Sequence, residues 1–148
     1  QLFLGITFNY GLLLGWTSIS EKLDIIPLIF YIGAIFWTLG YDTIYGYQDI
    51  KDDEIIGVKS TSIKFKKNPK LFLFPCYLIF YISIFLIGVL MSYSIFYFIF
   101  SIIIFLHLIF FQLKALNISR PQMCLRIFKS NNFLGFIVFI NILIGSYY

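Results

Sequence analysis

Five of the seven acidic side chains in this 148-residue chain lie in one short segment, between Asp42 and Glu54. If one helix runs through the segment, successive residues turn by about 100° around its axis. Four side chains then share a stripe within an arc of about 80°: Asp42, Tyr45, Asp49 and Asp53. Carboxylates on one face repel one another, and an aspartate at the centre of a membrane helix costs about 2.5–3.5 kcal/mol. Such a stripe must therefore face water at a membrane edge, an interior cavity or a cation.

A divalent cation would neutralise this stripe. Mg²⁺ prefers oxygen ligands and takes one or two carboxylates together with waters and substrate phosphates. Shortly after the acids come Lys59, Ser60 and Thr61, which offer a point charge and two hydroxyl donors to phosphate oxygens. This order is consistent with a magnesium–diphosphate site. A solvated loop in which acids balance lysines would have the same composition, but it leaves Asp42 unexplained, because that residue lies inside the apolar run.

The elements that must position these residues are membrane helices. Of the chain, 60% is hydrophobic and only 12% is charged, whereas soluble domains carry about 25% charged residues. Five apolar stretches each approach the roughly 20 residues that a helix needs to cross the hydrocarbon core. They run over about Leu2–Ile19, Ile25–Tyr45, Leu71–Met91, Ser94–Leu113 and Phe133–Tyr148. We therefore predict an all-α integral membrane bundle with five transmembrane helices.

The loops between these stretches differ sharply in charge. If every stretch crosses the membrane, residues 46–70 and 114–132 lie on one side and carry 10 of the 11 basic residues, with Lys22 alone opposite. The positive-inside rule places both long loops in the cytoplasm or on the equivalent matrix side. Basic residues gathered on one side of a bilayer explain the net charge of +4, so no nucleic-acid partner is expected.

The acidic segment resembles the second aspartate-rich motif of the UbiA prenyltransferase superfamily. That motif reads D-x-x-Y-x-x-x-D-x-x-x-D and is followed by G-x-K-S-T, which here are the stripe and Gly57–Thr61. A second stretch, Phe128–Gly135, resembles the F-x-x-N-N-x-x-G that precedes the last helix in the branch acting on 4-hydroxybenzoate. Its Asn131 and Asn132 are possible site residues, and they would equally suit a cap on that helix. The resemblance covers essentially the whole chain.

The resemblance implies a nine-helix fold in which residues 1–148 supply helices five to nine, the C-terminal part of a single transmembrane domain. The N-terminal half, which carries the first aspartate-rich motif, is expected as a missing partner, and this fragment alone is expected to be inactive. The implied activity is Mg²⁺-dependent transfer of a polyprenyl group from polyprenyl diphosphate to the ring of 4-hydroxybenzoate, in ubiquinone biosynthesis. The implied location is the bacterial inner membrane or the mitochondrial inner membrane.

The same resemblance assigns roles to individual residues. The magnesium ligands would be the three aspartates of the stripe, Asp42, Asp49 and Asp53. The diphosphate would contact Lys59, Ser60 and Thr61, with Lys59 stabilising the leaving group. Tyr45 would shield an allylic carbocation by a cation–π contact worth roughly 0.5–2 kcal/mol.

Other interpretations stay open at this point. A relative that uses homogentisate, a naphthoate or a haem precursor would carry the same aspartate motif, although the Asn-Asn-x-x-Gly stretch favours 4-hydroxybenzoate. A cation-coupled transporter would also place acids within membrane helices. It would be expected to carry them in several spans, whereas here they cluster at one helix end. A non-catalytic membrane remnant is the third possibility.

Overall fold

The structure, a computed structural model, describes residues 1–147 as helices joined by short connections, without a strand among them. Five helical units are long and apolar enough to span a membrane: Leu2–Ser20, Ile25–Gly46, Pro69–Leu90, Ile95–Lys114 and Pro121–Tyr147. The predicted all-α bundle of five spans is confirmed, and the chain is an integral membrane protein.

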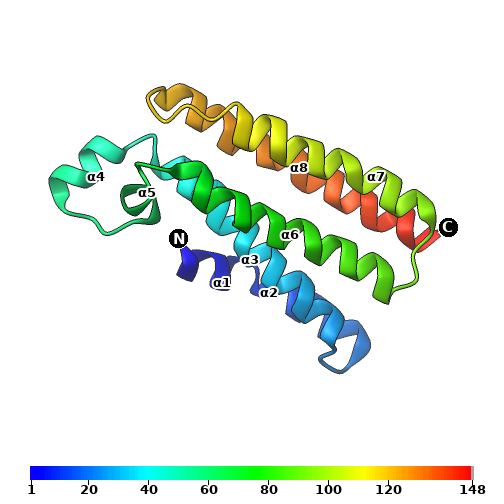
Figure 1. Ribbon diagram of the computed structural model, residues 1–148. Coiled ribbons are helices and arrows are strands. Elements are labelled where there is room, and N and C mark those ends of the chain that lie inside the picture. Colours follow the sequence, from blue (N-terminus) through cyan, green and yellow to red (C-terminus); the bar gives the residue numbers. More distant parts are fainter. Residues whose placement is uncertain (148) are drawn as a thin grey trace.

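Helix α3 (Ile25–Gly46) lies at the centre of this arrangement. It packs along α6 (Pro69–Leu90) and also contacts α8 (Pro121–Tyr147) and the short helices α1 (Leu2–Phe8) and α2 (Tyr10–Ser20). Helix α7 (Ile95–Leu106) pairs with α8. Both long connections, after α3 and before α8, lie at one end of the bundle, and the turns after α2 and α6 lie at the other (Figure 1). The two connections therefore lie at one end of the bundle, and the side of the membrane that this end faces stays a prediction.

The most extensive helix contact in the bundle is between α3 and α6. Gly33 and Gly40 face α6 there, and a Cβ atom at either position would collide with the side chain of Ser83 or Tyr77. Small residues at such crossings let membrane helices approach closely, so that van der Waals contact replaces the hydrophobic driving force that lipid cannot supply. The fully buried side chains of Ile44 and Phe80 complete this interface.

The first span is interrupted, which the sequence pattern did not predict. Asn9 separates α1 from α2, and its side-chain amide donates to the carbonyl oxygen of Gly5 and to Oγ1 of Thr38, both at 2.8 Å. Asparagine side chains compete with the helical backbone for such bonds. The break is therefore tied to α3 by a polar contact.

The last span begins earlier than predicted. Helix α8 starts at Pro121 rather than at Phe133, so the predicted loop 114–132 shrinks to the residues between Lys114 and Pro121. Hydropathy indicates where a helix enters lipid, but backbone hydrogen bonds also stabilise a helix outside the lipid. The start at Pro121 fits the preference for proline at the first helical position. Tyr148, the predicted end of this span, lies outside the described residues.

Candidate functional site

The predicted acidic stripe is divided between two helices. Helix α3 ends at Gly46, and Asp49 is the N-cap of the short helix α4 (Ile50–Ile56). In between, the backbone N–H groups of Tyr47 and Gln48 bond three residues back, to the carbonyls of Ile44 and Tyr45. The prediction of one continuous helix through this segment is therefore wrong: α3 tightens in its last turn and the chain changes direction.

Burial of apolar side chains explains this change of direction. Tyr47 is fully buried and Ile50 nearly so, and both belong to the main core. Burial also raises the pKa of the Tyr47 phenol to about 12, because the phenolate would lose its hydration there. The two side chains anchor the junction between α3 and α4, whereas the carboxylates of Asp49 and Asp52 stay exposed.

The predicted magnesium ligands differ in their surroundings. Asp42 is half-buried in the last turns of α3, Asp53 is half-buried on α4, and Asp49 is exposed between them. Within residues 1–147, no three His, Cys, Asp or Glu side chains lie close enough together to hold a metal ion. The donor types suit Mg²⁺, which needs only one or two protein carboxylates beside phosphate oxygens and waters. Magnesium binding stays a prediction, and it would need ligands besides these three.

The G-x-K-S-T stretch folds back onto α3 beside Asp42. Gly57 has a φ of +78°, in the left-handed region that glycine adopts without strain, and it turns the chain after α4. Helix α5 (Thr61–Lys64) is then fixed by Thr43: the Oγ1 atoms of Thr61 and Thr43 lie 2.6 Å apart, and Ser62 Oγ donates to the Thr43 carbonyl at 2.8 Å.

The predicted phosphate-binding residues have distinct positions in this loop. Ser60 is the N-cap of α5, and its Oγ accepts a hydrogen bond from the N–H of Ile63 at 3.2 Å. The hydroxyl of Thr61 is shared with Thr43, whereas the Ser60 hydroxyl only accepts in its bond to Ile63 and keeps its own O–H for a further partner. Lys59 is exposed, so its ammonium and the O–H of Ser60 are the donors of this stretch that can meet an anion.

Aromatic rings separate the acidic end of α3 from α8. Tyr41 and Tyr45 both contact Phe128, with ring centroids 5.7 Å and 4.7 Å apart. Trp37 lies one turn deeper, stacked on Phe80 at 4.8 Å and edge-on to Tyr41 at 5.8 Å. Tyr45, predicted to shield a cation, is thus held by Phe128 and remains partly exposed.

A buried polar network lies directly below these rings and joins four helical segments. Asn131 Oδ1 on α8 accepts from Trp37 Nε1 on α3 and from Gln112 Nε2, both at 2.9 Å. Gln112 Oε1 in turn accepts from the Tyr77 hydroxyl on α6 at 3.1 Å. The predicted cap role of Asn131 and Asn132 is wrong, because both lie well inside α8; Asn131 is buried in the network and Asn132 is exposed.

Sequence reasoning missed Gln112, although a signal was present. Gln112 lies in η1 (His107–Lys114), a π-helical continuation of α7. At the end of η1, the N–H of Ala115 donates to the carbonyl of Phe110, five residues back. Such π-helical turns are rare and often mark functional sites. A buried amide near the end of an apolar run was the available signal, since polar side chains in a membrane helix usually join neighbouring helices.

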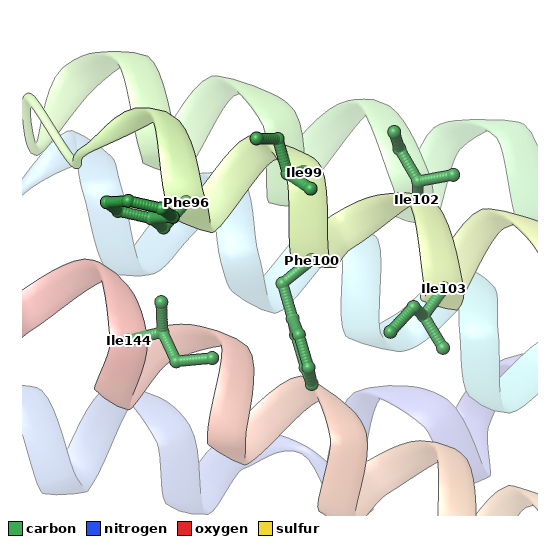
Figure 2. Close-up of a pocket in the computed structure, with 6 residues that line it drawn as sticks. All are labelled: Phe96, Ile99, Phe100, Ile102, Ile103 and Ile144. Atoms are coloured by element: carbon green, nitrogen blue, oxygen red, sulfur yellow. The ribbon is translucent and has the colours of Figure 1, made fainter.

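The apolar groove in Figure 2 is separate from this constellation. It is lined on α7 by Phe96, Ile99, Phe100, Ile102 and Ile103, and on α8 by Ile144. None of these side chains can polarise or bind a diphosphate. The groove therefore offers contact to hydrocarbon and has no part in the polar site.

Comparisons with known proteins identify the family of the chain. The profile of the UbiA prenyltransferase family matches residues 1–143. The chain is 39% identical over 147 residues to the "4-hydroxybenzoate polyprenyltransferase, mitochondrial" of Bos taurus and 40% identical over 147 residues to that of Homo sapiens. The Dictyostelium discoideum protein of the same name is 36% identical over 149 residues.

These relatives are much longer than the chain. Each alignment covers 99% of the chain but only 39% of the Bos taurus and Homo sapiens proteins and 31% of the Dictyostelium discoideum protein. No solved structure matches the chain significantly.

Proposed function

The chain belongs to the UbiA prenyltransferase family, and on this premise we propose that it takes part in transferring a polyprenyl group from polyprenyl diphosphate to the ring of 4-hydroxybenzoate. The observation that carries the proposal is the docking of α5 onto Thr43. Two hydrogen bonds hold Thr61 and Ser62 against the residue next to Asp42. Lys59, two residues before Thr61, lies within about 7 Å of it along the chain. Asp42 and the Lys59 loop thus lie at the same polar end of the membrane bundle.

The residues of the chain would bind the diphosphate head as follows. Because the three aspartates do not form one cluster, one or two of Asp42, Asp49 and Asp53 would bind Mg²⁺ directly and the rest through water. The bound ion would supply electrostatic stabilisation of the diphosphate leaving group. Lys59 would place its ammonium against the diphosphate oxygens that gain charge as the allylic C–O bond breaks. Ser60 would donate its O–H to a diphosphate oxygen, and Thr61, whose hydroxyl is shared with Thr43, would hold the loop in place. Further ligands and much of the prenyl pocket are expected from sequence outside these 148 residues.

Bond heterolysis would leave an allylic carbocation beside the aromatic rings at the end of α3. The exposed face of Tyr45, held by Phe128, would stabilise the cation and help to exclude water, which would otherwise quench it. The ring of 4-hydroxybenzoate would then attack ortho to its hydroxyl, and loss of the ring proton would restore aromaticity. The apolar bundle suits this chemistry, because the polyprenyl tail can stay in lipid while the head reaches the polar end.

The proposed topology places the active end on the cytoplasmic or matrix side. Ten of the 11 basic residues lie at the end that carries α4 and α5, and Lys22 lies at the other. Positive charge near membrane helices is retained on that side. The relatives named above are mitochondrial proteins, which favours the mitochondrial inner membrane over the bacterial inner membrane for this chain.

Acceptor choice is the test of this proposal. Membranes containing the complete enzyme would be supplied with a polyprenyl diphosphate, Mg²⁺ and one acceptor at a time: 4-hydroxybenzoate, homogentisate or a dihydroxynaphthoate. We expect Mg²⁺-dependent prenylation of 4-hydroxybenzoate, with the other two acceptors at least about tenfold slower. A site that hydrogen-bonds the polar groups of one acceptor leaves its own polar groups unpaired when another acceptor binds. Preference for homogentisate or the naphthoate would replace the proposed acceptor, and no transfer to any acceptor would refute the enzymatic proposal.

A further inference from the structure

We propose that a groove between the start of α6 and the end of η1 binds an anionic phospholipid of the leaflet that meets the polar end of the bundle. The groove has a volume of about 1000 Å³ and is separate from the residues assigned to prenyl transfer. Its walls come from two helical segments that contact each other and that lie at the same end as α4 and α5 (Figure 1).

The mouth of the groove is positively charged. Lys67, Lys70 and Lys114 line it, and no acidic side chain does. Within the described part of the chain, none of these three lysines forms an ion pair; the single one found joins Lys66 to Glu54, outside the groove. Lys114 Nζ lies 5.4 Å from the centre of the Phe110 ring, a cation–π contact that holds this ammonium at the edge of the bundle. Three uncompensated ammonium groups favour an anion.

The interior of the groove is apolar. Leu71 and Phe74 on α6 and Ile109 on η1 line it, and the last two lie about one helical turn from Lys70 and Lys114, towards the middle of the bundle. Phe74 and Ile109 also line a narrow crevice that continues along α6 and α7 between Leu78 and Phe105. Leu71 is 75% exposed and Phe74 49% exposed, so the apolar wall is open to whatever fills the groove.

The order of these groups matches a phospholipid better than a soluble anion. A free phosphate would satisfy the lysines but leave the apolar wall without a partner. A phospholipid places its headgroup phosphate at the lysines and its acyl chains along Phe74 and Ile109. Basic pockets between transmembrane helices on the cytoplasmic or matrix side bind anionic headgroups by this combination.

Lipid retention can be measured on the intact protein in nanodiscs of phosphatidylcholine with increasing fractions of phosphatidylglycerol. Native mass spectrometry would count the phosphatidylglycerol molecules that stay bound. The groove variant is K67Q/K70Q/K114Q, and the matched control K51Q/K64Q/K129Q removes the same charge from the same end of the bundle outside the groove. We expect at least about tenfold weaker retention in the groove variant, within about twofold of wild type in the control, and recovery in K67R/K70R/K114R.

Several results would overturn the proposal. Equal losses in the groove and control variants would mean that general surface charge attracts the lipid. Unchanged retention in the groove variant, with native tryptophan fluorescence, would exclude the lysines as its binding groups. Displacement of phosphatidylglycerol by inorganic phosphate would assign the groove to a soluble anion, and displacement by polyprenyl diphosphate would assign it to the substrate.

Discussion

Replacing Asn131 with leucine should destabilise the helix bundle, because Asn131 Oδ1 accepts hydrogen bonds from two buried donors, Trp37 Nε1 and Gln112 Nε2. Gln112 is fully buried, and leaving a buried donor without a partner costs about 1–3 kcal/mol. Single interhelical hydrogen bonds in membranes contribute less on average, about 0.6 kcal/mol. Gln112 also keeps Ser130 Oγ at 3.4 Å as a weaker partner. We therefore expect a loss between about 1 kcal/mol, the sum of two average interhelical bonds, and about 3 kcal/mol, the cost of one buried donor left fully unpaired.

The neighbouring residue provides the matched control. Asn132 is exposed on the same helix, so Asn132→Leu should change stability by less than about 0.5 kcal/mol. Reversible unfolding in mixed micelles, titrated with SDS and followed by tryptophan fluorescence, would measure both variants, and Trp37 reports directly on the network. If Asn131→Leu proves as stable as Asn132→Leu, the network does not hold α3, η1 and α8 together.

Three further predictions concern the polar end of the bundle. Thr43→Val removes the hydroxyl that meets Thr61, so trypsin should cut the α4–α5 segment several-fold faster in that variant, and an unchanged cleavage rate would contradict the docking of α5. Lys59→Gln should raise the KM for polyprenyl diphosphate at least about tenfold. The control Lys51→Gln, at an exposed lysine on α4, should leave this KM within twofold of wild type. Equal effects of the two substitutions would show that Lys59 does not belong to the site. Burial raises the pKa of Tyr47 to about 12, so the stability that its protonated phenol contributes is complete below pH 10 and is lost as the pH rises from 10 towards 12. Tyr47→Phe should therefore flatten this part of the curve of stability against pH. An unchanged slope would show that the phenol is not buried.

The membrane spans could be predicted from the sequence because hydropathy reports directly on transfer into lipid. The ends of α3 and α6 lie within about two residues of the predicted stretches. The start of α8 was missed because Arg126 and Lys129 make its first turns polar, although helical hydrogen bonds do not depend on the solvent. The break at Asn9 was missed because its cause, the hydrogen bond to Thr38, lies 29 residues away along the chain.

The polar site was predicted in its residue types but not in its geometry. A stripe calculated on one helix assumed that α3 continues, whereas burial of Tyr47 and Ile50 in the core turns the chain before Asp49. Local spacing contains no information on that burial. The role of Asn131 was equally hidden, because its interhelical partners come from two other segments, α3 and η1.

Magnesium titration of prenyl transfer by three single variants tests the central claim most directly. In the complete enzyme, Asp42→Asn and Asp49→Asn should lower kcat/KM by about 10²–10³, in line with the loss of one group that stabilises developing charge, and should shift the Mg²⁺ dependence to higher concentration. Asp52→Asn, an exposed acid on α4 outside the assigned set, should stay within a few-fold of wild type. Wild-type rates and Mg²⁺ dependence in both Asp42→Asn and Asp49→Asn would contradict the proposal that these aspartates bind the diphosphate through magnesium.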